Sequence, residues 1–406
     1  MQTNLADFIR GTRDGDEAEA ILRACVHCGF CTATCPTYQL LGDERDGPRG
    51  RIYLIKQVLE GAVPTAKTQL HLDRCLTCRN CETTCPSGVQ YGRLIDIGRK
   101  VVDQRVVRGR REKFTRMTLR HLLPNTALFG AAFRAGLAVR PLLSKDLQDK
   151  LQAPRPPGKR PTRAHARKML VLEGCVQPAM APSINAAAAR VLDAFGVQLI
   201  SAPKAGCCGA VRYHLNHQED GLDDMRRNID AWWPHIEQVE AILMTASGCG
   251  VTVKEYGHLL AHDSAYAAMA ARIAGMTVDL SEVMPQFEAE LAARLRGKIT
   301  ERVAFHPPCT LQHGQQIRGK VEGVLRAAGV DVVLCQDSHL CCGSAGTYSV
   351  LHPHIAHELR DAKLASLAAT GAAQIVSANV GCISHLQSGT DTPVSHWIEL
   401  IDRALR

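Results

Sequence analysis

The spacing of apolar residues predicts helices through the first 110 residues of the chain. Residues 1–24 begin with a polar stretch and end in one short predicted helix. Residues 48–60 and 91–108 each place their apolar side chains on one helical face. Asp46 or Gly47 is suited to cap the first of these helices, and arginines gather at the end of the second, where the helix dipole favours positive charge. This part of the chain is therefore predicted to be mainly helical.

Residues 112–150 combine apolar side chains with many basic ones. The interleaved basic residues are Arg116, Arg120, His121, Arg134, Arg140 and Lys145. A basic amphipathic stretch of this kind is suited to a membrane surface, although it more often packs on its own domain or on a partner subunit. The longest apolar candidate, 127–143, is interrupted by two arginines and a proline, so no membrane-spanning helix is predicted.

A proline- and arginine-rich linker at 154–161 leads into a C-terminal half that repeats itself. The matching segments are 168–175 with 302–309, 206–209 with 340–343, and 241–249 with 374–382. Corresponding cysteines are separated by 134 residues at three positions and by 133 at the fourth. This constant offset predicts two copies of one structural unit.

Each copy alternates short apolar runs with helical patterns. Predicted helices at 186–195 and 319–328 precede predicted strands at 197–201 and 330–334. Such alternation is typical of α/β layering with parallel strands. The cysteines fall at the ends of predicted strands or in the following loops, where open α/β sheets bind ligands. We expect the two copies to pack as a pseudo-two-fold α/β domain.

Seventeen cysteines in a chain of 406 residues carry the clearest chemical signal. Eight of them follow the spacing C-x2-C-x2-C-x3-C-P twice, as Cys25, Cys28, Cys31 and Cys35 before Pro36, and as Cys75, Cys78, Cys81 and Cys85 before Pro86. This is the spacing of bacterial ferredoxins with two [4Fe–4S] clusters. Each proline interrupts regular structure after the cysteine loop, because proline donates no backbone hydrogen bond.

In two-cluster ferredoxins the fourth cysteine of each run binds the other cluster. The predicted ligand sets are therefore Cys25, Cys28 and Cys31 with Cys85, and Cys75, Cys78 and Cys81 with Cys35. Gly29 lets backbone N–H groups approach the first cluster closely, whereas Arg79 takes the matching place in the second run. The two clusters need not share one reduction potential.

Zinc sites and disulfides are the alternative interpretations of these cysteines. Structural zinc usually takes two separated pairs of cysteines rather than one run of four. The N-terminus has neither a basic segment nor an apolar one, so no signal peptide is predicted, and disulfides are not expected in the reducing compartment that this implies.

Several other classes of function receive no support from the sequence. The net charge of +8 is modest and no nucleic-acid-binding motif accompanies it, so we expect no nucleic-acid partner. No G-x-G-x-x-G follows a predicted strand, which argues against a flavin or nicotinamide site in this chain. No acid–base pair marks a substrate pocket, and so no catalytic residue is assigned.

The doubled pattern of C, CCG and C in the C-terminal half resembles the cysteine-rich CCG domain. That domain occurs in the catalytic subunit of heterodisulfide reductase and in iron–sulfur subunits of membrane-associated dehydrogenases. Its fusion to a two-cluster ferredoxin domain resembles the iron–sulfur subunits of glycolate oxidase. It is similar, too, to the third subunit of anaerobic glycerol-3-phosphate dehydrogenase and to lactate-utilisation proteins. The resemblance extends from Cys25 to about His385.

The resemblance implies a fold and a function together. The fold is a mainly helical, bacterial-type two-cluster ferredoxin domain followed by a pseudo-two-fold α/β tandem CCG domain. The function is electron transfer from flavoprotein subunits, which oxidise glycolate, to a quinone or another respiratory acceptor. A cytoplasmic chain on the inner face of the cytoplasmic membrane is implied, as a glycolate oxidase subunit that carries electrons rather than the substrate site.

The resemblance also implies that the CCG cysteines hold iron. The candidate ligands are Cys175, Cys207, Cys208 and Cys249 in the first copy, and Cys309, Cys341, Cys342 and Cys382 in the second. In heterodisulfide reductase each copy ends in C-x2-C, but here Ala246 and Asn379 replace the first cysteine. Four thiols per copy are enough for an ordinary further cluster. Disulfide-cleaving chemistry, the rival hypothesis, is disfavoured by the two missing cysteines.

These expectations define four segments. Residues 1–110 form the ferredoxin-type domain, and 111–165 form the basic amphipathic region with its linker. Residues 166–290 and 291–406 form the two CCG copies.

Overall fold

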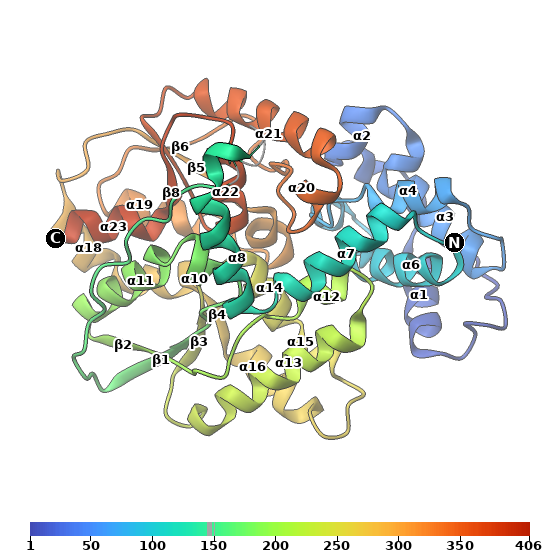
Figure 1. The fold of residues 1–406 in the computed structure, drawn as a ribbon, viewed down its shortest axis with the longest axis horizontal. Coiled ribbons are helices and arrows are strands. Elements are labelled where there is room, and N and C mark those ends of the chain that lie inside the picture. Colours follow the sequence, from blue (N-terminus) through green and yellow to red (C-terminus); the bar gives the residue numbers. More distant parts are fainter. Residues whose placement is uncertain (144–147, 150) are drawn as a thin grey trace. The chain divides into compact units, whose positions relative to one another are not determined.

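The structure is a computed structural model that describes residues 1–143, 148–149 and 151–406 (Figure 1). Lys145 of the basic amphipathic region lies outside the described residues. The chain forms two compact units. Unit 1 comprises Met1–Met117 and His339–Leu359, and unit 2 comprises Thr118–Ser338 and Arg360–Arg406. A segment of the second CCG copy therefore belongs to the same unit as the ferredoxin-type domain.

Unit 1 is helical in its described residues, as the apolar spacing predicted. Its helices are α1 (Arg13–Ala24), α2 (Pro36–Leu41), α3 (Pro48–Leu59), α4 (Ala66–Asp73), α5 (Asn80–Thr84), α6 (Tyr91–Arg105), α20 (Tyr348–Leu351) and the first residues of α7 (Arg110–Leu122) and α21 (Pro353–Ala368). Short 3₁₀ turns occupy Phe30–Thr32 and Glu44–Asp46. The predicted helix at 48–60 is confirmed to within one residue, and Gly47 rather than Asp46 is its N-cap.

The spacing of apolar residues did not predict α4, which lies directly before the second cysteine run. Thr65 caps this helix through its hydroxyl and Thr68 returns the bond to the Thr65 backbone, which is a capping box. Its buried residues include Gln69, His71 and Asp73. A helix with a polar buried face gives no amphipathic signal, and this explains the omission.

The core of unit 1 lies where α3 and α6 cross. Ile55 of α3 and Leu94 and Ile95 of α6 are completely buried there. Gly98 of α6 faces Ile55 so closely that a Cβ atom would lie 2.6 Å from Ile55 Cγ1. The absence of a side chain at Gly98 thus permits the close approach of the two helices that follow the cysteine runs in the chain.

Unit 2 contains two four-stranded parallel sheets of the same topology. The first has the order β2-β1-β3-β4 and the second the order β6-β5-β7-β8. The strands are β1 (Arg167–Val171), β2 (Val197–Ser201), β3 (Ala241–Met244), β4 (Thr277–Asp279), β5 (Val303–His306), β6 (Val332–Leu334), β7 (Gln374–Ser377) and β8 (Val394–His396). The predicted α/β repeat is confirmed. The edge strands β4 and β8 were not predicted, because runs of three residues are too short to show a strand pattern.

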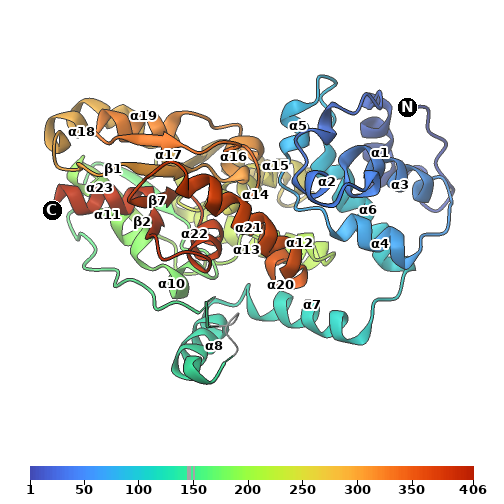
Figure 2. The same ribbon diagram turned by 90° about the horizontal axis from the view of Figure 1, so that it is seen from above.

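Helices of unit 2 cover both faces of these sheets. They are α10 (Gln177–Met180), α11 (Ser183–Ala194), α12 (Ala210–His214), α13 (Gln218–Trp232), α14 (Ser247–Lys254), α15 (Tyr256–Leu259), α16 (Ala267–Met276), α17 (Leu280–Val283), α18 (Glu288–Leu295), α19 (Lys320–Ala327), α22 (Val380–Gln387), α23 (Trp397–Leu405), and the remainder of α21. Helices α11 and α23 pack side by side (Figure 2), and Arg190 binds Asp402 between them through two bonds of 2.8 Å.

Alternate residues of the first sheet enter two different cores. Met169 and Leu243 face a core that includes Phe305 and Val376 of the second sheet. Leu170 and Ile242 face the opposite side, toward Trp232 of α13. Because successive side chains of a strand point to opposite faces, a strand buried on both faces must be apolar throughout. This requirement accounts for the continuous apolar runs in the sequence.

In its described residues, the basic amphipathic region contains the helices α7 and α8 (Thr126–Ala138). Asn125 caps α8 by accepting a hydrogen bond from the Leu128 amide at 3.0 Å. Leu128, Val139 and Leu142 are exposed, together with Arg134 and Arg140. Among the described residues, no helix is both long enough and apolar enough to cross a bilayer.

Candidate metal centres

The first predicted set of thiols comes together in unit 1. The side chains of Cys28 and Cys85 lie close enough to Cys25 to act on its ionisation, and burial, the larger cause, raises the pKa of Cys25. Burial likewise raises the pKa of Cys31 to about 11, with further contributions from Cys25, Cys85 and Cys28. The fourth cysteine of the second run thus lies with the first three of the first run.

The second set is assembled in the same way. Burial raises the pKa of Cys81 well above its usual value, and the nearby thiols of Cys78, Cys75 and Cys35 raise it further. Cys35 closes this set from the first run, as the ferredoxin arrangement predicted. Mutual repulsion among buried thiolates is unfavourable unless cations lie between them, and iron ions would supply that charge.

The backbone of the two cysteine loops adopts nearly the same unusual shape. His27 and Thr77 both have positive φ, at 60° and 53°, and Gly29 and Arg79 both lie in the left-handed region, at 87° and 60°. Arg79 therefore adopts a conformation that favours glycine, and Glu82 accepts a bond of 2.8 Å from its side chain. Matching geometry in loops of different sequence indicates that the ligand arrangement dictates the backbone.

The thiols of the first set line a cavity whose walls are largely apolar. Cys25, Cys28, Cys31 and Cys85 all line it, with Phe30, Ile52 and Val89 among its apolar walls. Four converging sulfur atoms at the edge of an apolar cavity fit the donor set of a [4Fe–4S] cluster.

The second set lies beside the segment of the second CCG copy that belongs to unit 1. Asn80 donates to the carbonyl oxygens of Thr34 and His339, at 3.0 and 3.2 Å. Tyr348 donates to the Arg74 carbonyl at 3.0 Å. Burial raises the pKa of Tyr348, and Arg51, Cys75 and Cys341 are near enough to influence it. Cys341 thus lies in the neighbourhood of the second set.

A third group of four thiols is formed by the first CCG copy, within unit 2. Cys175 follows β1, Cys207 and Cys208 follow β2, and Cys249 lies in the first turn of α14 after β3. Each of these thiols lies near enough to the next, in that order, to affect its ionisation. The neighbouring thiol of Cys207, and then burial, raise the pKa of Cys175. Three neighbouring strands thus deliver four sulfur atoms to one edge of the sheet, as the repeat predicted.

Two buried side chains hold the double cysteine of this group in place. The amide of Asn228 accepts from the Gly206 N–H at 2.8 Å and donates to the Cys207 carbonyl at 2.7 Å and to the Tyr256 hydroxyl at 3.1 Å. Tyr256 in turn donates to the Cys208 carbonyl at 2.9 Å. Asn228 and Tyr256 were not predicted, since an isolated polar residue in a helical pattern gives no signal of burial.

The cysteines of the second CCG copy are divided between the units. Cys309, after β5, and Cys382, in α22, belong to unit 2, whereas Cys341 and Cys342 belong to unit 1. Asn379, which replaces a cysteine of the heterodisulfide reductase pattern, donates to Cys382 Sγ at 3.6 Å.

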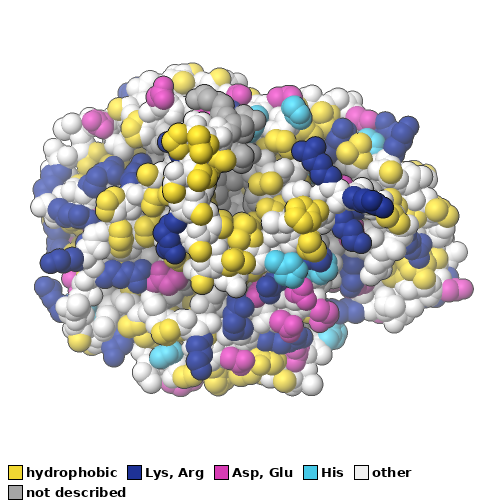
Figure 3. Space-filling model, in the orientation of Figure 1, with side chains coloured by type: hydrophobic (Ala, Val, Ile, Leu, Met, Phe, Trp, Pro, Cys, Tyr) yellow, Lys and Arg dark blue, Asp and Glu magenta, His cyan; other side chains and the backbone are white. Residues whose placement is uncertain are grey.

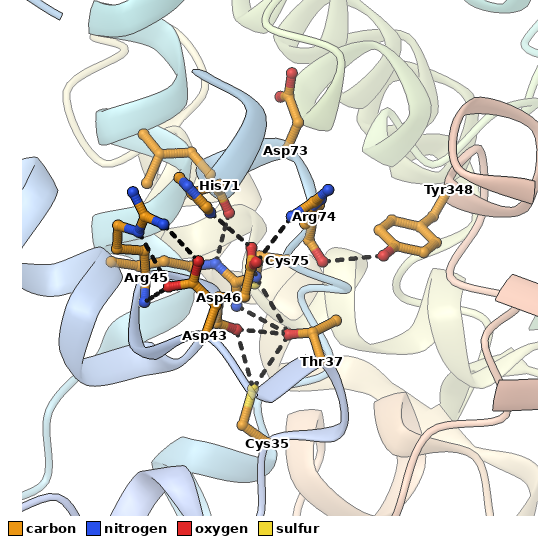
Figure 4. A network of polar contacts seen from close by, with 12 residues as sticks. Cys35, Thr37, Asp43, Arg45, Asp46, His71, Asp73, Arg74, Cys75 and Tyr348 are labelled. Atoms are coloured by element: carbon orange, nitrogen blue, oxygen red, sulfur yellow. Dashed lines mark hydrogen bonds and ion pairs between the residues drawn. The ribbon is translucent and has the colours of Figure 1, made fainter. Parts of the chain in front are cut away.

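A network of charged residues next to Cys35 also escaped the sequence reading (Figure 4). It contains Thr37, Asp46, Arg51, His71 and Arg74, and Asp46 and Arg51 are essentially inaccessible to solvent. Arginine and aspartate are usually exposed, so sequence alone gave no reason to place them beneath a cysteine loop.

Comparison with protein families supports the two-part organisation. A family model for a 4Fe-4S dicluster domain matches residues 21–89. A model for the cysteine-rich CCG domain matches twice, at residues 169–254 and 303–387. The predicted ferredoxin-type domain, its iron–sulfur cofactors and the tandem CCG repeat are confirmed.

Curated relatives match over most or all of the chain. The glycolate oxidase iron-sulfur subunit of Escherichia coli (strain K12) is 55% identical over 100% of this chain and 99% of its own length. A probable glycolate oxidase iron-sulfur subunit of Bacillus subtilis (strain 168) is 29% identical over 93% of this chain and 90% of its own length. The lactate utilization protein A of Anoxybacillus flavithermus is 25% identical and covers 54% of this chain and 92% of its own length.

The full-length match agrees with the order of the domains and with both cysteine runs. The resemblance drawn from the motifs is therefore confirmed. The chain belongs to the family of glycolate oxidase iron–sulfur subunits.

Proposed function

We propose that this chain carries electrons within a glycolate-oxidising complex, from a flavoprotein subunit to a quinone or another respiratory acceptor. The observation that carries the proposal is the exchange of Cys35 and Cys85 between the two cysteine runs, which gives two complete four-thiol sets in one helical unit. A [4Fe–4S] cluster supplies reversible one-electron transfer when bound. Oxidation of a hydroxyl to a carbonyl releases two electrons and two protons, and a quinone takes up the same number.

The residues of unit 1 have defined roles in this proposal. Cys25, Cys28, Cys31 and Cys85 hold one cluster, and Cys75, Cys78, Cys81 and Cys35 hold the other. Apolar residues such as Ile52 and Val89 exclude water from the first site. Asn80 and Tyr348 keep the segment that contains Cys341 and Cys342 beside the second.

Reconstitution with separate subunits tests this function. The chain, purified without oxygen, is expected to contain about eight irons from the two ferredoxin clusters. Alone it should not oxidise glycolate, and it should restore dye reduction when flavoprotein subunits of the complex and glycolate are added. Glycolate oxidation by this chain alone, or the absence of iron, would contradict the proposal.

We also propose that the first CCG copy holds a further cluster through Cys175, Cys207, Cys208 and Cys249. The convergence of these four thiols at the ends of β1, β2 and β3, each near enough to the next to affect its ionisation, supports the assignment. An iron content of about twelve per chain is expected in that case. A value of about eight would restrict the clusters to unit 1. An unchanged content of about twelve in Cys208→Ser would exclude Cys208 as a ligand.

We further propose that unit 2 meets the inner face of the cytoplasmic membrane through α8, close to the quinone. Figure 3 shows hydrophobic side chains gathered over this helix beside lysine and arginine side chains. The exposed apolar residues include Leu128, Val139 and Leu142. A helix of this kind binds anionic bilayers through both its apolar and its basic side chains.

Sedimentation with lipid vesicles tests this surface. The chain should sediment with anionic vesicles, and Leu128→Asp should release it. Leu334→Asp, at an exposed apolar residue of β6, is the matched control, and this variant should still sediment with the vesicles. Equal binding by wild type and Leu128→Asp would exclude α8 as the contact.

A further inference from the structure

The charged network in unit 1 is centred on the carboxylate of Asp46, which is completely buried. Arg74 donates to one of its oxygens at 2.9 Å, and His71 Nδ1 lies 3.0 Å from the other. Arg51 Nη2 lies 3.5 Å from that second oxygen. A carboxylate oxygen of Asp43 also lies within 4.8 Å of Asp46 and His71, and Asp43 is paired with Arg45 at 2.6 Å. Three guanidinium groups therefore accompany two carboxylates, so the network contains more positive than negative charge.

Arg51 connects this charge to a cysteine through one hydroxyl group. Its two Nη atoms each donate to Thr37 Oγ1 at 3.2 Å, and its Nε donates to the His71 carbonyl at 2.7 Å. Thr37 Oγ1 lies 3.3 Å from Cys35 Sγ and 2.8 Å from the Asp46 carbonyl oxygen. Since the guanidinium occupies the lone pairs of the hydroxyl, the single hydroxyl proton is left for a three-centre bond, in which the Asp46 carbonyl oxygen at 2.8 Å is the nearer acceptor and Cys35 Sγ at 3.3 Å the second.

Other donors also reach the sulfur atoms of the second set. The Thr77 amide donates to Cys75 Sγ at 3.4 Å, and the Tyr91 hydroxyl donates to the same atom at 3.6 Å. Arg99 donates to the carbonyl oxygens of Leu72 and Cys75 in the same loop. Arg51, Tyr91 and Arg99 are all buried, so water screens their charges and dipoles weakly.

The first set has a different environment. Ser87, which follows Pro86 as Thr37 follows Pro36, is partly exposed. Arg49 of α3 is one cation near the first loop, since its Nη1 would lie 3.0 Å from a Cβ at Gly29, and the ammonium group of Met1, which donates to the Cys25 carbonyl at 2.8 Å, is another. However, Arg49 is paired with Glu44 at 2.6 Å and both side chains are solvent-accessible, at 37% and 42%. A paired and hydrated charge acts only weakly on its surroundings.

We propose that Arg51, acting through the Thr37 hydroxyl on Cys35 Sγ, raises the reduction potential of the cluster bound by Cys35, Cys75, Cys78 and Cys81. Reduction adds one negative charge to a cluster, and hydrogen bonds to its sulfur atoms and nearby positive charge favour that state. Arg51 and Thr37 are positioning residues rather than ligands. The inference rests on the proposed ligand sets of the two clusters.

Potentiometric titration of the full-length chain, followed by electron paramagnetic resonance, tests the inference. The signal of the second cluster is identified by its loss in Cys78→Ser. Thr37→Val should favour the oxidised form of that cluster by tenfold or more, a downward shift of about 59 mV for a one-electron couple. Thr37→Ser keeps the hydroxyl and should retain the wild-type potential. Arg51→Met should shift it further, and Arg51→Lys less.

Two controls separate tuning from general disruption. Arg49→Met lies on the same helix and Ser87→Ala at the matching position of the other run, and neither should move the potential of the second cluster. Iron content must equal that of the wild type. Since solvent exposure also affects potentials, variants are compared at one cluster rather than between clusters.

Each result of this experiment decides the inference. An unchanged potential in Thr37→Val with full iron content would overturn it, as would equal shifts of both clusters. If Arg51→Met loses its iron, the pair Thr37→Val and Thr37→Ser still decides the matter. The measurement uses chemical reductants and no partner subunit, so failure of glycolate-dependent electron transfer would leave its result intact.

Discussion

Four thiols are brought together in two contrasting ways in this chain. In unit 1, each set takes three cysteines from a loop of seven residues and only one from far along the chain. In the first CCG copy, four cysteines spread over residues 175–249 meet because three parallel strands end at the same edge. The loop supplies most of its geometry locally, whereas the sheet supplies it only after folding. The second group should therefore be more sensitive to changes in distant packing.

The largest expected effect concerns the exchange of cysteines in unit 1. Cys85→Ser should remove the cluster of the first run, although Cys85 lies in the second, because it completes the set of Cys25, Cys28 and Cys31. Iron content should fall by about four per chain, and electron transfer should be lost. Iron analysis with electron paramagnetic resonance measures both.

The control for this variant is Cys335→Ser, at a buried cysteine outside every predicted set. It should keep the full iron content. Loss of the second-run signal and retention of the first-run signal in Cys85→Ser would show that each run holds its own cluster.

The next effect addresses the thiol group of unit 2. Cys208→Ser should reduce the iron content from about twelve to about eight. It should leave both ferredoxin signals unchanged, because the proposed ligands of the cluster in the first CCG copy all lie in unit 2. Iron analysis on protein purified without oxygen is the measurement. If the ferredoxin signals disappear as well, the sites in unit 1 and the site in the first CCG copy do not form independently, which would contradict the prediction.

A smaller effect is expected where the sheet-built site depends on packing. Asn228→Ala removes three hydrogen bonds around Cys207, two of them buried, and should lower the stability of unit 2 by about 2 kcal/mol. Hydrogen exchange of α13 and of the loop at Cys207 should rise. Asp223→Ala, at an exposed residue of the same helix, should leave exchange nearly unchanged. Equal protection in both variants would contradict this role.

The smallest effect is a pH dependence confined to unit 2. His396 Nε2 donates to the Thr245 carbonyl at 2.9 Å and Nδ1 accepts from the Ile398 amide, so the folded state holds the neutral ring. Burial lowers the pKa of His396 to about 4 from its ordinary value of 6.5. The unfolded chain therefore binds the proton more readily, and stability falls as the pH decreases through the interval between these values.

Between about pH 7.5 and about pH 5 this residue should cost about 2 kcal/mol of stability. Hydrogen exchange of β8 and α23 at the two pH values measures the loss, and His396→Gln should reduce it. His306, whose pKa burial lowers to about 3, contributes in the same direction, so the comparison of variant with wild type is decisive. An identical pH dependence in both proteins would exclude His396 as the cause.

Sequence alone determined the features that depend on short-range spacing. The two cysteine runs, helix α3 and the repeat offset could be predicted because each depends on residues close together or on an internal copy. The short apolar runs of β1 and β3 indicated strands of a parallel sheet, and the structure buries both faces of these strands. The family resemblance followed from the same motifs and is confirmed by the full-length match.

Tertiary structure alone decided what surrounds the sulfur atoms. From the sequence, Asp46 and Arg51 would be expected on the surface, as charged residues usually are. Both are buried beside Cys35, because α3 and α4 pack there. Asn228 and Tyr256 hydrogen-bond to the backbone of Cys207 and Cys208, which lie 21 and 48 positions away from them in the chain. The identity of a ligand is a local property of the chain. The charge and hydrogen bonds that act on it depend on which distant side chains share its low-dielectric surroundings, and only the folded chain decides that.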